Sequence, residues 1–477
     1  AGSGLSLSPL RLMALETYDR LNAAGIACAL RTGEEQREPW SGQSPTHLAA
    51  TVEAGLDEKE WDVAVVDEAQ MLKDGDRGWA WTHALLGVAA RHLCVCAAPE
   101  AEAVLMGLAE QLGEPLSFYR VERATPLKAL PHPVNLDAVK PGDALIAFSR
   151  QRALGYRAWL RQRGHSVACI YGDLGAEVRR HEAERFRTGQ AAVLVATDAI
   201  GMGLNLPIRR VIMTETDKYD GRSRRALTSG EWRQIGGRAG RRGFHEYGEV
   251  GVLKGLSARE AQKNLELPVT PLPATPLFIQ PTWVVVERVA KVFGLTRLSQ
   301  VLEQTAGLLE GQSLWSARWL RQQAQTPWVQ ALAAVGMSLR LQFDYMRCPV
   351  RPTQVDTVQH WARTHHAGQP IAAPTVVGTE VPSTTAELET LERVGHCLDT
   401  YRWLAMAFPE AYSQGEQARE RLAGVQERIG RALAEQGLQR LCAGCGRTLA
   451  VAHAFPLCDP CHWARRSTGM RYDDYDF

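Results

Sequence analysis

Two adjacent carboxylates end a short apolar run early in the chain. Asp67 and Glu68 directly follow VAVV (63–66), within the stretch VAVVDEAQM (63–71). An apolar run of this length is typical of a strand buried on both faces. Carboxylates at the end of such a strand can hold a hydrated Mg²⁺ and orient an attacking water. Acidic residues also end strands at ordinary solvated surfaces, so the pair alone leaves both interpretations open.

Two further segments carry residue types that suit phosphate chemistry. TDAIGMGLN (197–205) follows a second apolar run, and QIGGRAGRRG (234–243) places a glutamine and arginines among glycines. Glycine lets the backbone approach another group closely, and the arginine guanidinium binds phosphate oxygens in pairs. Taken singly, the glycines fit turns and the arginines fit a solvated face. The order and spacing of the three segments together favour a nucleotide site.

Four of the ten cysteines stand in two pairs near the end of the chain, as CAGC and CDPC separated by twelve residues. These four residues are Cys442, Cys445, Cys458 and Cys461. Two thiolate pairs supply the tetrahedral ligand set that Zn²⁺ prefers, and the spacing is typical of zinc ribbons. A disulfide pair is the alternative, and His453 or His462 could replace a cysteine ligand.

Composition limits the class of protein. The chain has 477 residues, 45% of them hydrophobic, which predicts two to four domains rather than one core. Its 54 basic and 53 acidic residues leave a formal charge of +1, so any basic surface for a polyanion must be local. No run of about 18 apolar residues predicts a membrane span. No charged start followed by an apolar core predicts export, so we expect an intracellular protein without a membrane partner.

Short apolar runs alternate with helical patterns over the first 255 residues or so. This alternation predicts two α/β domains with parallel sheets covered on both faces, joined by a proline-containing connector at 125–143. The predicted strands are LSLS (5–8), ACAL (27–30), VAVV (63–66), CVCA (94–97), LIAF (145–148), ACIY (168–171), VLVAT (193–197), VIMT (211–214) and EVGVL (249–253). Ligands gather at the carboxyl ends of parallel strands, where Asp67, Glu68, Thr197 and Asp198 fall.

The composition changes after residue 265. A proline-rich junction (268–281) leads into helical spacing, and Thr384 with Glu387 predicts a capping box that opens one helix. Another helix is predicted by the apolar stripe Leu422, Val425, Ile429 and Leu433. The predicted domains are α/β at 1–124 and 125–265, a mainly helical region at 266–440, and a zinc-binding module with a tail at 441–477.

The motifs and their order resemble the superfamily 2 DExH-type RNA helicases, most closely the ATP-dependent RNA helicase of the mitochondrial degradosome and its bacterial relatives. The motifs are SPLRLMALETYDRLN (8–22), TGEE (32–35), TVE (51–53), DEAQM (67–71), RGWAWTHALLG (77–87), FSR (148–150), IYGDL (170–174), ATDAIGMGLNLPIRRVI (196–212) and QIGGRAGRRG (234–243). The resemblance is strong over residues 5–253. Beyond them it is diffuse, resting on pieces such as LQFDYMRCPV (341–350). It implies two RecA-like domains, the first truncated at its start.

The resemblance implies a role for each residue of the DEAQ segment. Asp67 would hold Mg²⁺ through water on the phosphates of ATP. Glu68 would orient and deprotonate the attacking water, because phosphoryl transfer needs a positioned cation and nucleophile more than covalent help. Gln70 would couple the site to the second domain.

In the second domain the resemblance implies four further nucleotide contacts. Gly201 and Gln234 would line the nucleotide cleft. Arg238 and Arg241 resemble the arginine fingers that meet the γ-phosphate, an effect worth roughly 10³ to 10⁵ in rate where NTPases have been measured. Because these residues lie on a different domain from the carboxylates, domain closure would complete the site.

The resemblance also implies contacts to a nucleic-acid backbone through hydroxyls, amides and one guanidinium. The implied positions are Pro9, Arg11, Thr32, Gly33, Thr51, Ser149 and Thr197. Such contacts position a strand without reading its sequence. Helix capping is the alternative for each hydroxyl, and for Trp79 and Trp81 we expect helix packing rather than base stacking.

The implied partner is RNA, single-stranded and duplex, with 3′ to 5′ translocation. Three points stay open: DNA as the substrate, a non-catalytic nucleic-acid-binding scaffold, and an exoribonuclease partner. The compartment expected is the bacterial cytoplasm, with the mitochondrial matrix as the alternative.

One expected motif is missing from the 477 residues. No lysine follows a glycine, so there is no GxxxxGK[ST] loop to cradle the phosphates. We expect this loop some 20 residues before Ala1, in a longer helicase of which this chain is an amino-terminal truncation. Because half of the site would then be absent, we expect the 477 residues alone to hydrolyse ATP negligibly.

Overall fold

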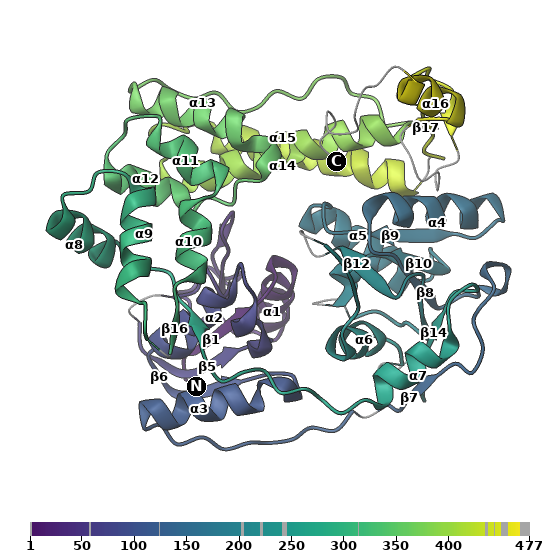
Figure 1. Cartoon of the computed structure of the whole chain (residues 1–477), viewed down its shortest axis with the longest axis horizontal. Helices are drawn as coiled ribbons and strands as arrows, with labels where there is room; N and C mark the ends of the chain where they lie inside the picture. The colour runs from purple at the N-terminus through teal and green to yellow at the C-terminus, as the bar shows by residue number, and fades with distance from the viewer. Residues whose placement is uncertain are drawn as a thin grey trace. The chain divides into compact units, whose positions relative to one another are not determined.

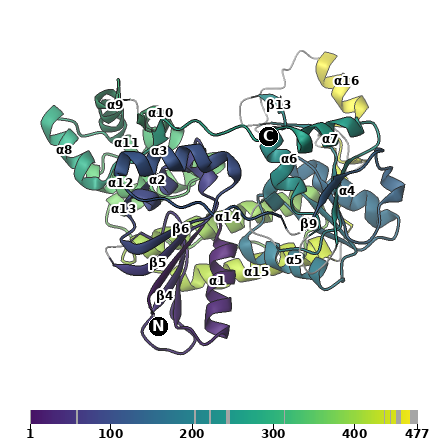
Figure 2. The same ribbon diagram turned by 90° about the horizontal axis from the view of Figure 1, so that it is seen from below.

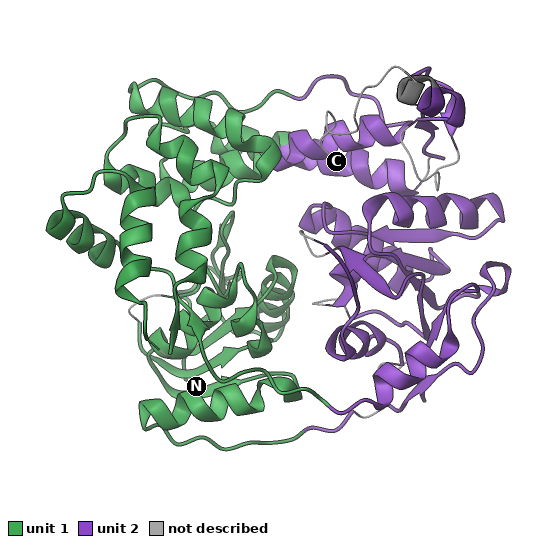
Figure 3. Ribbon diagram, in the orientation of Figure 1, with its two compact units in different colours: residues 1–120, 269–375, 397–421 green, residues 121–268, 376–396, 422–477 purple. Residues whose placement is uncertain are grey.

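The computed structural model describes residues 2–56, 59–123, 125–201, 205–219, 223–240, 246–312, 314–434, 437–442, 444–449 and 457–467, without the side chains of 464–467. The chain forms two compact units, coloured separately in Figure 3. Unit 1 comprises residues 1–120, 269–375 and 397–421, and unit 2 comprises residues 121–268, 376–396 and 422–477. The domain limits at 124, 265 and 440 stay predictions.

Unit 1 contains a six-stranded sheet in the order β3-β2-β4-β1-β5-β6. Its strands are β1 (Gly4–Ser8), β2 (Cys28–Arg31), β3 (Gln36–Arg37), β4 (His47–Thr51), β5 (Trp61–Val66) and β6 (Ala90–Val95). Every neighbouring pair is parallel except β2 with β3. The central strand β1 pairs Leu7 with Ala50 on β4 and with Val66 on β5. All three side chains are fully buried, so the middle of this sheet is covered on both faces.

Helices of unit 1 build its core around the sheet. They are α1 (Arg11–Ala23), α2 (Gly78–Gly87) and α3 (Glu102–Leu112). Helix α1 packs Ala14 and Tyr18 against Cys28 and Ala49, on the side of the sheet where Figure 2 shows it beside β4. A separate cluster joins β1, β4 and β5 to α2 and α3.

Unit 2 contains a second six-stranded sheet, parallel throughout, in the order β7-β14-β11-β8-β10-β9. Its strands are β7 (Leu127–Ala129), β8 (Asp143–Ile146), β9 (Val167–Ile170), β10 (Val193–Ala196), β11 (Arg210–Met213) and β14 (Gly248–Val252). Its helices are α4 (Arg150–Gln162), α5 (Ala176–Arg187), α6 (Ser229–Gly236) and α7 (Ala258–Glu266), and β12 (Asp217–Tyr219) with β13 (Arg224–Ala226) forms a hairpin. The predicted strands are confirmed in both units.

The structure corrects the sequence analysis at three strands. Strand β4 was not predicted, because HLAAT lacks large apolar residues, yet it lies buried between β2 and β1. The stretch 125–143 contains β7, since an edge strand tolerates the nearby prolines. Four of the six residues of β6 are exposed, so this edge strand is not covered as expected.

The rest of the chain is mainly helical, as predicted. The remaining α-helices are α8 (Trp283–Phe293), α9 (Leu298–Leu308), α10 (Arg318–Ala324), α11 (Pro327–Ala333), α12 (Leu339–Met346), α13 (Val355–His366), α14 (Thr385–Ala407), α15 (Gly415–Ala434) and α16 (Asp459–Ser467) (Figure 1). Short pairs of strands are β15 (Leu277–Phe278) with β16 (Trp315–Ser316), and β17 (Arg440–Leu441) with β18 (Thr448–Leu449). The 3₁₀ helices are η1 (Ala69–Lys73), η2 (Pro99–Ala101), η3 (Leu136–Ala138), η4 (Asp198–Gly201) and η5 (Pro352–Gln354).

Both helices predicted from local patterns are confirmed. Thr384 Oγ1 accepts a hydrogen bond from the Glu387 amide at 3.1 Å, and Glu387 accepts one from the Thr384 amide, which is the predicted capping box of α14. The predicted apolar stripe lies buried along α15. Within the described part of the chain, none of the helices has both the length and the apolar character that crossing a bilayer requires.

Helix α6 of unit 2 begins at a second capping box, formed by Thr228 and Glu231. Glu231 also accepts hydrogen bonds from Arg225 and forms an ion pair with Lys218 at 2.8 Å. Although burial acts to raise the pKa of this carboxyl, the hydrogen bonds from Arg225 and Lys218 lower it from 4.5 to about 2. The ionised carboxylate therefore stabilises the fold above about pH 4.5, and this contribution is lost as the pH falls toward about 2.

We predict that Glu231→Gln removes part of the acid sensitivity of unit 2. The wild-type thermal midpoint should fall between about pH 4.5 and about pH 2, and the variant, already less stable at neutral pH, should fall less. Glu177→Gln, which changes an exposed ion pair on α5, is the control and should follow the wild type. Equal acid sensitivity of Glu231→Gln and the wild type would contradict the prediction.

Candidate nucleotide and nucleic-acid site

Four neighbouring strands of unit 1 end beside predicted site residues. Pro9 follows β1, Thr32 follows β2, Thr51 ends β4 and Asp67 follows β5. These strands are adjacent and parallel, so their carboxyl ends lie along one edge of the sheet. The structure thus brings the predicted nucleotide and backbone contacts of this unit to a common edge.

The backbone turns sharply where β5 ends. Among the described residues, Glu68 is the non-glycine residue with a positive φ, 52°. Such a left-handed conformation costs a side-chain-bearing residue roughly 1–2 kcal/mol. The Asp67 side chain supports the turn by accepting a hydrogen bond from the Glu68 amide at 2.9 Å, and the Ala69 amide donates to the carbonyl of Cys96 at 2.9 Å. Strain of this kind persists where surrounding contacts fix it, and it is common at functional sites.

Gln70 connects the carboxylate loop to the segment after β6. Its amide nitrogen donates to Glu68 Oε2, and its amide oxygen accepts from the Ala98 amide at 3.0 Å. The predicted coupling of Gln70 to the second domain stays a prediction. Trp81 is fully buried and donates from Nε1 to the Asp67 carbonyl at 2.9 Å. Trp79 lies in ring contact with Trp319, so both tryptophans pack within unit 1.

Arg11, the predicted guanidinium contact, is held by carboxylates in unit 1. It forms an ion pair with Glu34, and its Nη1 lies 3.9 Å from Asp399 Oδ1 on α14. The neighbouring Gly33 faces the same helix, because a Cβ at this position would lie 3.3 Å from the indole of Trp403. The predicted backbone contacts Arg11 and Gly33 therefore lie against α14, a neighbour that the sequence analysis did not identify.

Local contacts also fix the other predicted residues at this edge. Thr32 Oγ1 accepts a hydrogen bond from the Glu34 amide at 3.4 Å, and Thr51 is buried. The Pro9 carbonyl accepts a hydrogen bond from Arg77 at 2.6 Å, and Arg77 also binds Glu53. Sequence reasoning missed Arg77 as a site residue, although it opens the quoted stretch RGWAWTHALLG.

In unit 2 the adjacent strands β8 and β10 also end beside predicted contacts. Ser149 caps α4 after β8, accepting a hydrogen bond from the Arg152 amide at 3.2 Å. Thr197 follows β10 and accepts one from the Ala199 amide at 3.4 Å. Ser149 thus has the capping role that was the alternative, and a hydroxyl in this position still lies at the edge of the sheet.

The structure brings three of the predicted nucleotide contacts of unit 2 together. Arg238 donates to the Gly201 carbonyl, and a Cβ on Gly201 would lie 3.6 Å from Gln234 Cγ. Gly240 requires glycine, since its φ is +64° and a Cβ would lie 2.2 Å from the Gly248 amide nitrogen. Arg241 lies outside the described residues. A guanidinium and an amide beside a glycine backbone are groups that can bind phosphate oxygens.

The four cysteines of the two predicted pairs converge. The Sγ atoms of Cys442, Cys445, Cys458 and Cys461 all lie within 4.8 Å of one another. Backbone amides of Gly444 and Cys458 donate to Cys442 Sγ at 3.4 and 3.2 Å, as they would to a metal-bound thiolate. All four thiols are free cysteines, so the disulfide alternative does not describe this structure. His453 lies outside the described residues, and His462 is not part of the cluster.

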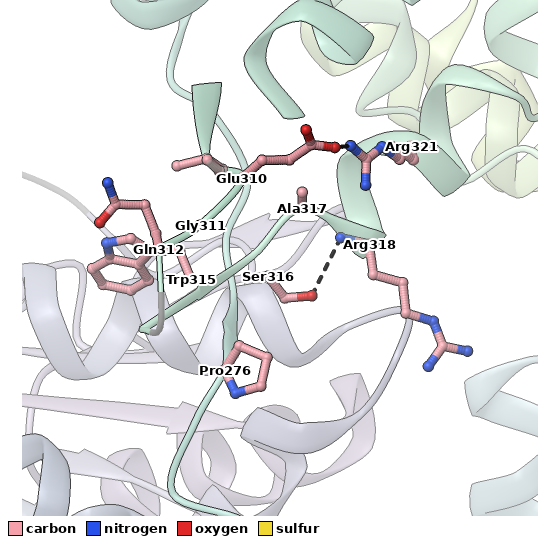
Figure 4. A pocket seen from close by; sticks show the side chains of 10 residues that line it. Pro276, Glu310, Gly311, Gln312, Trp315, Ser316, Ala317, Arg318 and Arg321 are labelled. Atoms are coloured by element: carbon pink, nitrogen blue, oxygen red, sulfur yellow. Dashed lines mark hydrogen bonds and ion pairs between the residues drawn. The ribbon is translucent and has the colours of Figure 1, made fainter. Parts of the chain in front are cut away.

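A shallow pocket of unit 1 lies away from every predicted site residue. It is lined by residues next to β15 and β16, and Figure 4 shows Glu310 paired with Arg321 at its rim. Arg318 donates its amide to Ser316 Oγ at 3.2 Å. Because its described lining contains none of the motif residues, this pocket is not part of the candidate site.

Family models match three segments of the chain. Residues 1–120 match "DEXQ-box helicase domain of Suv3", residues 127–243 match "Helicase conserved C-terminal domain", and residues 388–435 match "ATP-dependent RNA helicase SUV3 C-terminal domain". The third match covers most of α14 and all but the start of α15. The two compact units therefore carry RecA-like helicase domains.

Relatives from several eukaryotes match most of the chain. The mitochondrial DExH-box ATP-dependent RNA helicase DExH16 of Arabidopsis thaliana is 33% identical over 92% of this chain and 77% of its own length. The mitochondrial ATP-dependent RNA helicase SUPV3L1 of Homo sapiens is 30% identical over 88% of this chain and 55% of its own length. For SUV3 of Saccharomyces cerevisiae these values are 38%, 56% and 38%, so the chain spans about half or less of the human and yeast proteins. The chain belongs to the SUV3 family of DExH-box ATP-dependent RNA helicases.

Proposed function

We propose that this chain is the motor part of an ATP-dependent RNA helicase that moves 3′ to 5′ on single-stranded RNA and unwinds duplexes during RNA turnover. The observation that carries the proposal is the strained Asp67–Glu68 turn at the carboxyl edge of a parallel sheet. A chain gains no stability from a left-handed glutamate, so the conformation is best explained by what it does for the carboxylates. The names of the relatives favour RNA over DNA as the substrate.

ATP with Mg²⁺ fits the groups at the two edges. Asp67 would hold the hydrated cation, and Glu68 would accept the proton of the attacking water. In unit 2, Gln234, Arg238 and Arg241 would neutralise charge on the transferring phosphoryl group. The relatives' names support the mitochondrial matrix rather than the bacterial cytoplasm as the compartment. An exoribonuclease partner would suit a role in RNA turnover.

The first test concerns Glu68. In a protein that joins these 477 residues to a GxxxxGK[ST] phosphate loop, Glu68→Gln should lower kcat for ATP by roughly 10²–10⁴, because an amide does not accept the proton of the attacking water. Affinity for a non-hydrolysable ATP analogue should not change. Glu110→Gln, on the exposed face of α3 in the same unit, is the matched control. Undiminished steady-state turnover by Glu68→Gln would remove the proposed base.

The second test concerns the RNA backbone. The proposed contacts are hydroxyls, amides and Arg11, which bind phosphate rather than base edges. We predict that affinity for single-stranded RNA varies little with base sequence and falls steeply as salt rises from about 50 to about 200 mM. Fluorescence anisotropy with labelled oligo(U) and oligo(A), and with DNA of equal length, measures this. An affinity independent of salt would contradict backbone binding, and tighter binding and faster unwinding of DNA would favour the DNA helicase.

Zinc is the metal that the four converging thiols fit. Four sulfur ligands at this separation suit tetrahedral Zn²⁺, and the small tail around β17, β18 and α16 has few apolar side chains with which to form a core. We therefore propose a structural zinc site that folds this module.

Metal analysis tests the zinc proposal directly. The purified chain at neutral pH should contain about one zinc per molecule, and Cys458→Ser should lose it, because three thiolates bind the metal far less tightly than four. Cys94→Ser replaces an exposed cysteine on β6, outside the cluster, and should keep the zinc. A metal-free wild-type protein, or full zinc in Cys458→Ser, would refute the site.

A further inference from the structure

The first half of α14 binds two motifs of unit 2 through two side chains one turn apart. Glu392 accepts a hydrogen bond from the hydroxyl of Tyr171, and its Oε2 lies 2.9 Å from Arg150 Nε. His396 Nε2 lies 2.8 Å from the Asp173 carbonyl oxygen. Arg150 belongs to the FSR motif, and Tyr171 and Asp173 belong to IYGDL. One helix from the carboxyl-terminal part of the chain thus contacts both motifs.

Packing alone does not explain a charged residue in this place. Glu392 is 4% exposed and Tyr171 is fully buried. Removing a carboxylate from water costs several kcal/mol, and an apolar side chain of similar volume often serves stability as well or better. What the ion pair adds is direction, because the carboxylate fixes the positions of a guanidinium and a hydroxyl from two separate segments. Although burial acts to lower the pKa of Arg150, the charge of Glu392 raises it, which keeps the pair ionised.

The group held most directly by Glu392 lies next to a proposed RNA contact. Arg150 is the first residue of α4, and Ser149 is its cap. The guanidinium also lies over the ring of Tyr171, 5.6 Å from its centroid, so its position is set from two sides. Any displacement of Arg150 moves the first turn of α4, and with it the hydroxyl and amides that this turn presents at the edge of the sheet.

We propose that Glu392 is a positioning residue for RNA binding, which holds Arg150 and Tyr171 so that Ser149 and the first turn of α4 meet the RNA backbone in a fixed geometry. This inference rests on the proposed function, since it concerns how the same nucleic-acid site is built. It assigns a task to the segment that matches the SUV3 C-terminal domain, which is to hold the RNA-binding edge of the second helicase domain.

The test compares single-stranded RNA binding by the 477-residue chain and its variants over a range of salt concentrations. Glu392→Gln should bind oligo(U) roughly tenfold more weakly, and its log–log salt dependence should be shallower by about 0.7, the value for one lost phosphate contact on a single strand. A structural defect that only reduces the folded fraction would lower the number of binding sites and leave this slope unchanged. Titration at saturating RNA measures that number.

Glu389→Gln is the matched control. Glu389 lies one turn earlier on α14, is largely exposed, and is 3.9 Å from Arg150 Nη1. Both variants remove a negative charge near Arg150, which by itself strengthens binding to RNA. Glu389→Gln should therefore bind no more weakly than the wild type, and only loss of positioning explains weaker binding by Glu392→Gln.

A second variant covers the case in which Glu392→Gln does not fold. Tyr171→Phe keeps the ring against Arg150 and removes only the hydroxyl that binds Glu392, and it should weaken binding in the same direction by a smaller factor. Wild-type affinity in Tyr171→Phe, or equal affinities of Glu392→Gln and Glu389→Gln, would overturn the inference while the proposed function stands. If the unmodified chain binds no RNA, the proposed function fails, and the inference fails with it.

Discussion

Adjacent parallel strands all end at the same edge of their sheet, and the candidate site depends on this constraint. In unit 1 the strands β2, β4, β1 and β5 are neighbours in space although other elements separate them in sequence. Their pairing brings the residue that follows each strand to one line of the surface. The central strands are buried on both faces, so their positions are fixed by packing, and the polar residues at their ends inherit that precision. In unit 2, β8 and β10 place Ser149 and Thr197 in the same way.

At this edge the structure spends stability on geometry at one residue. The left-handed Glu68 is held between a strand that cannot move and a 3₁₀ turn that begins at Ala69. Gln70 and the carbonyl of Cys96 fix the turn from the segment after β6, and buried Trp81 fixes the Asp67 carbonyl. A carboxylate set this firmly loses little entropy when it orients a water, which is how preorganised groups lower a reaction barrier.

The sequence predicted the two parallel sheets because buried strands have a simple signature, a short run apolar on both faces. It predicted the carboxylate edge and the cysteine cluster because both depend on residues close together in the chain. Strand β4 was missed because its alanines and histidine have no such signature, and its place depends on the strands beside it. The partners of Arg11 and Arg150 were missed for another reason. Asp399 and Glu392 lie more than 200 residues from them in sequence, and no local pattern marks one acidic residue of a long helix as a buried partner.

These distant partners share a property that explains their location. Asp399 and Glu392 are both on α14, and each lies beside an arginine close to a predicted backbone contact in its own unit. An arginine near an anionic strand is attracted to phosphate whatever its orientation, so charge alone gives affinity without a defined register. A carboxylate beside it removes part of that attraction and restricts the guanidinium to one direction. A motor that must release and rebind a strand at each step is better served by weaker, directed contacts than by strong, undirected ones, and the carboxylates of α14 change the contacts of both units in that direction.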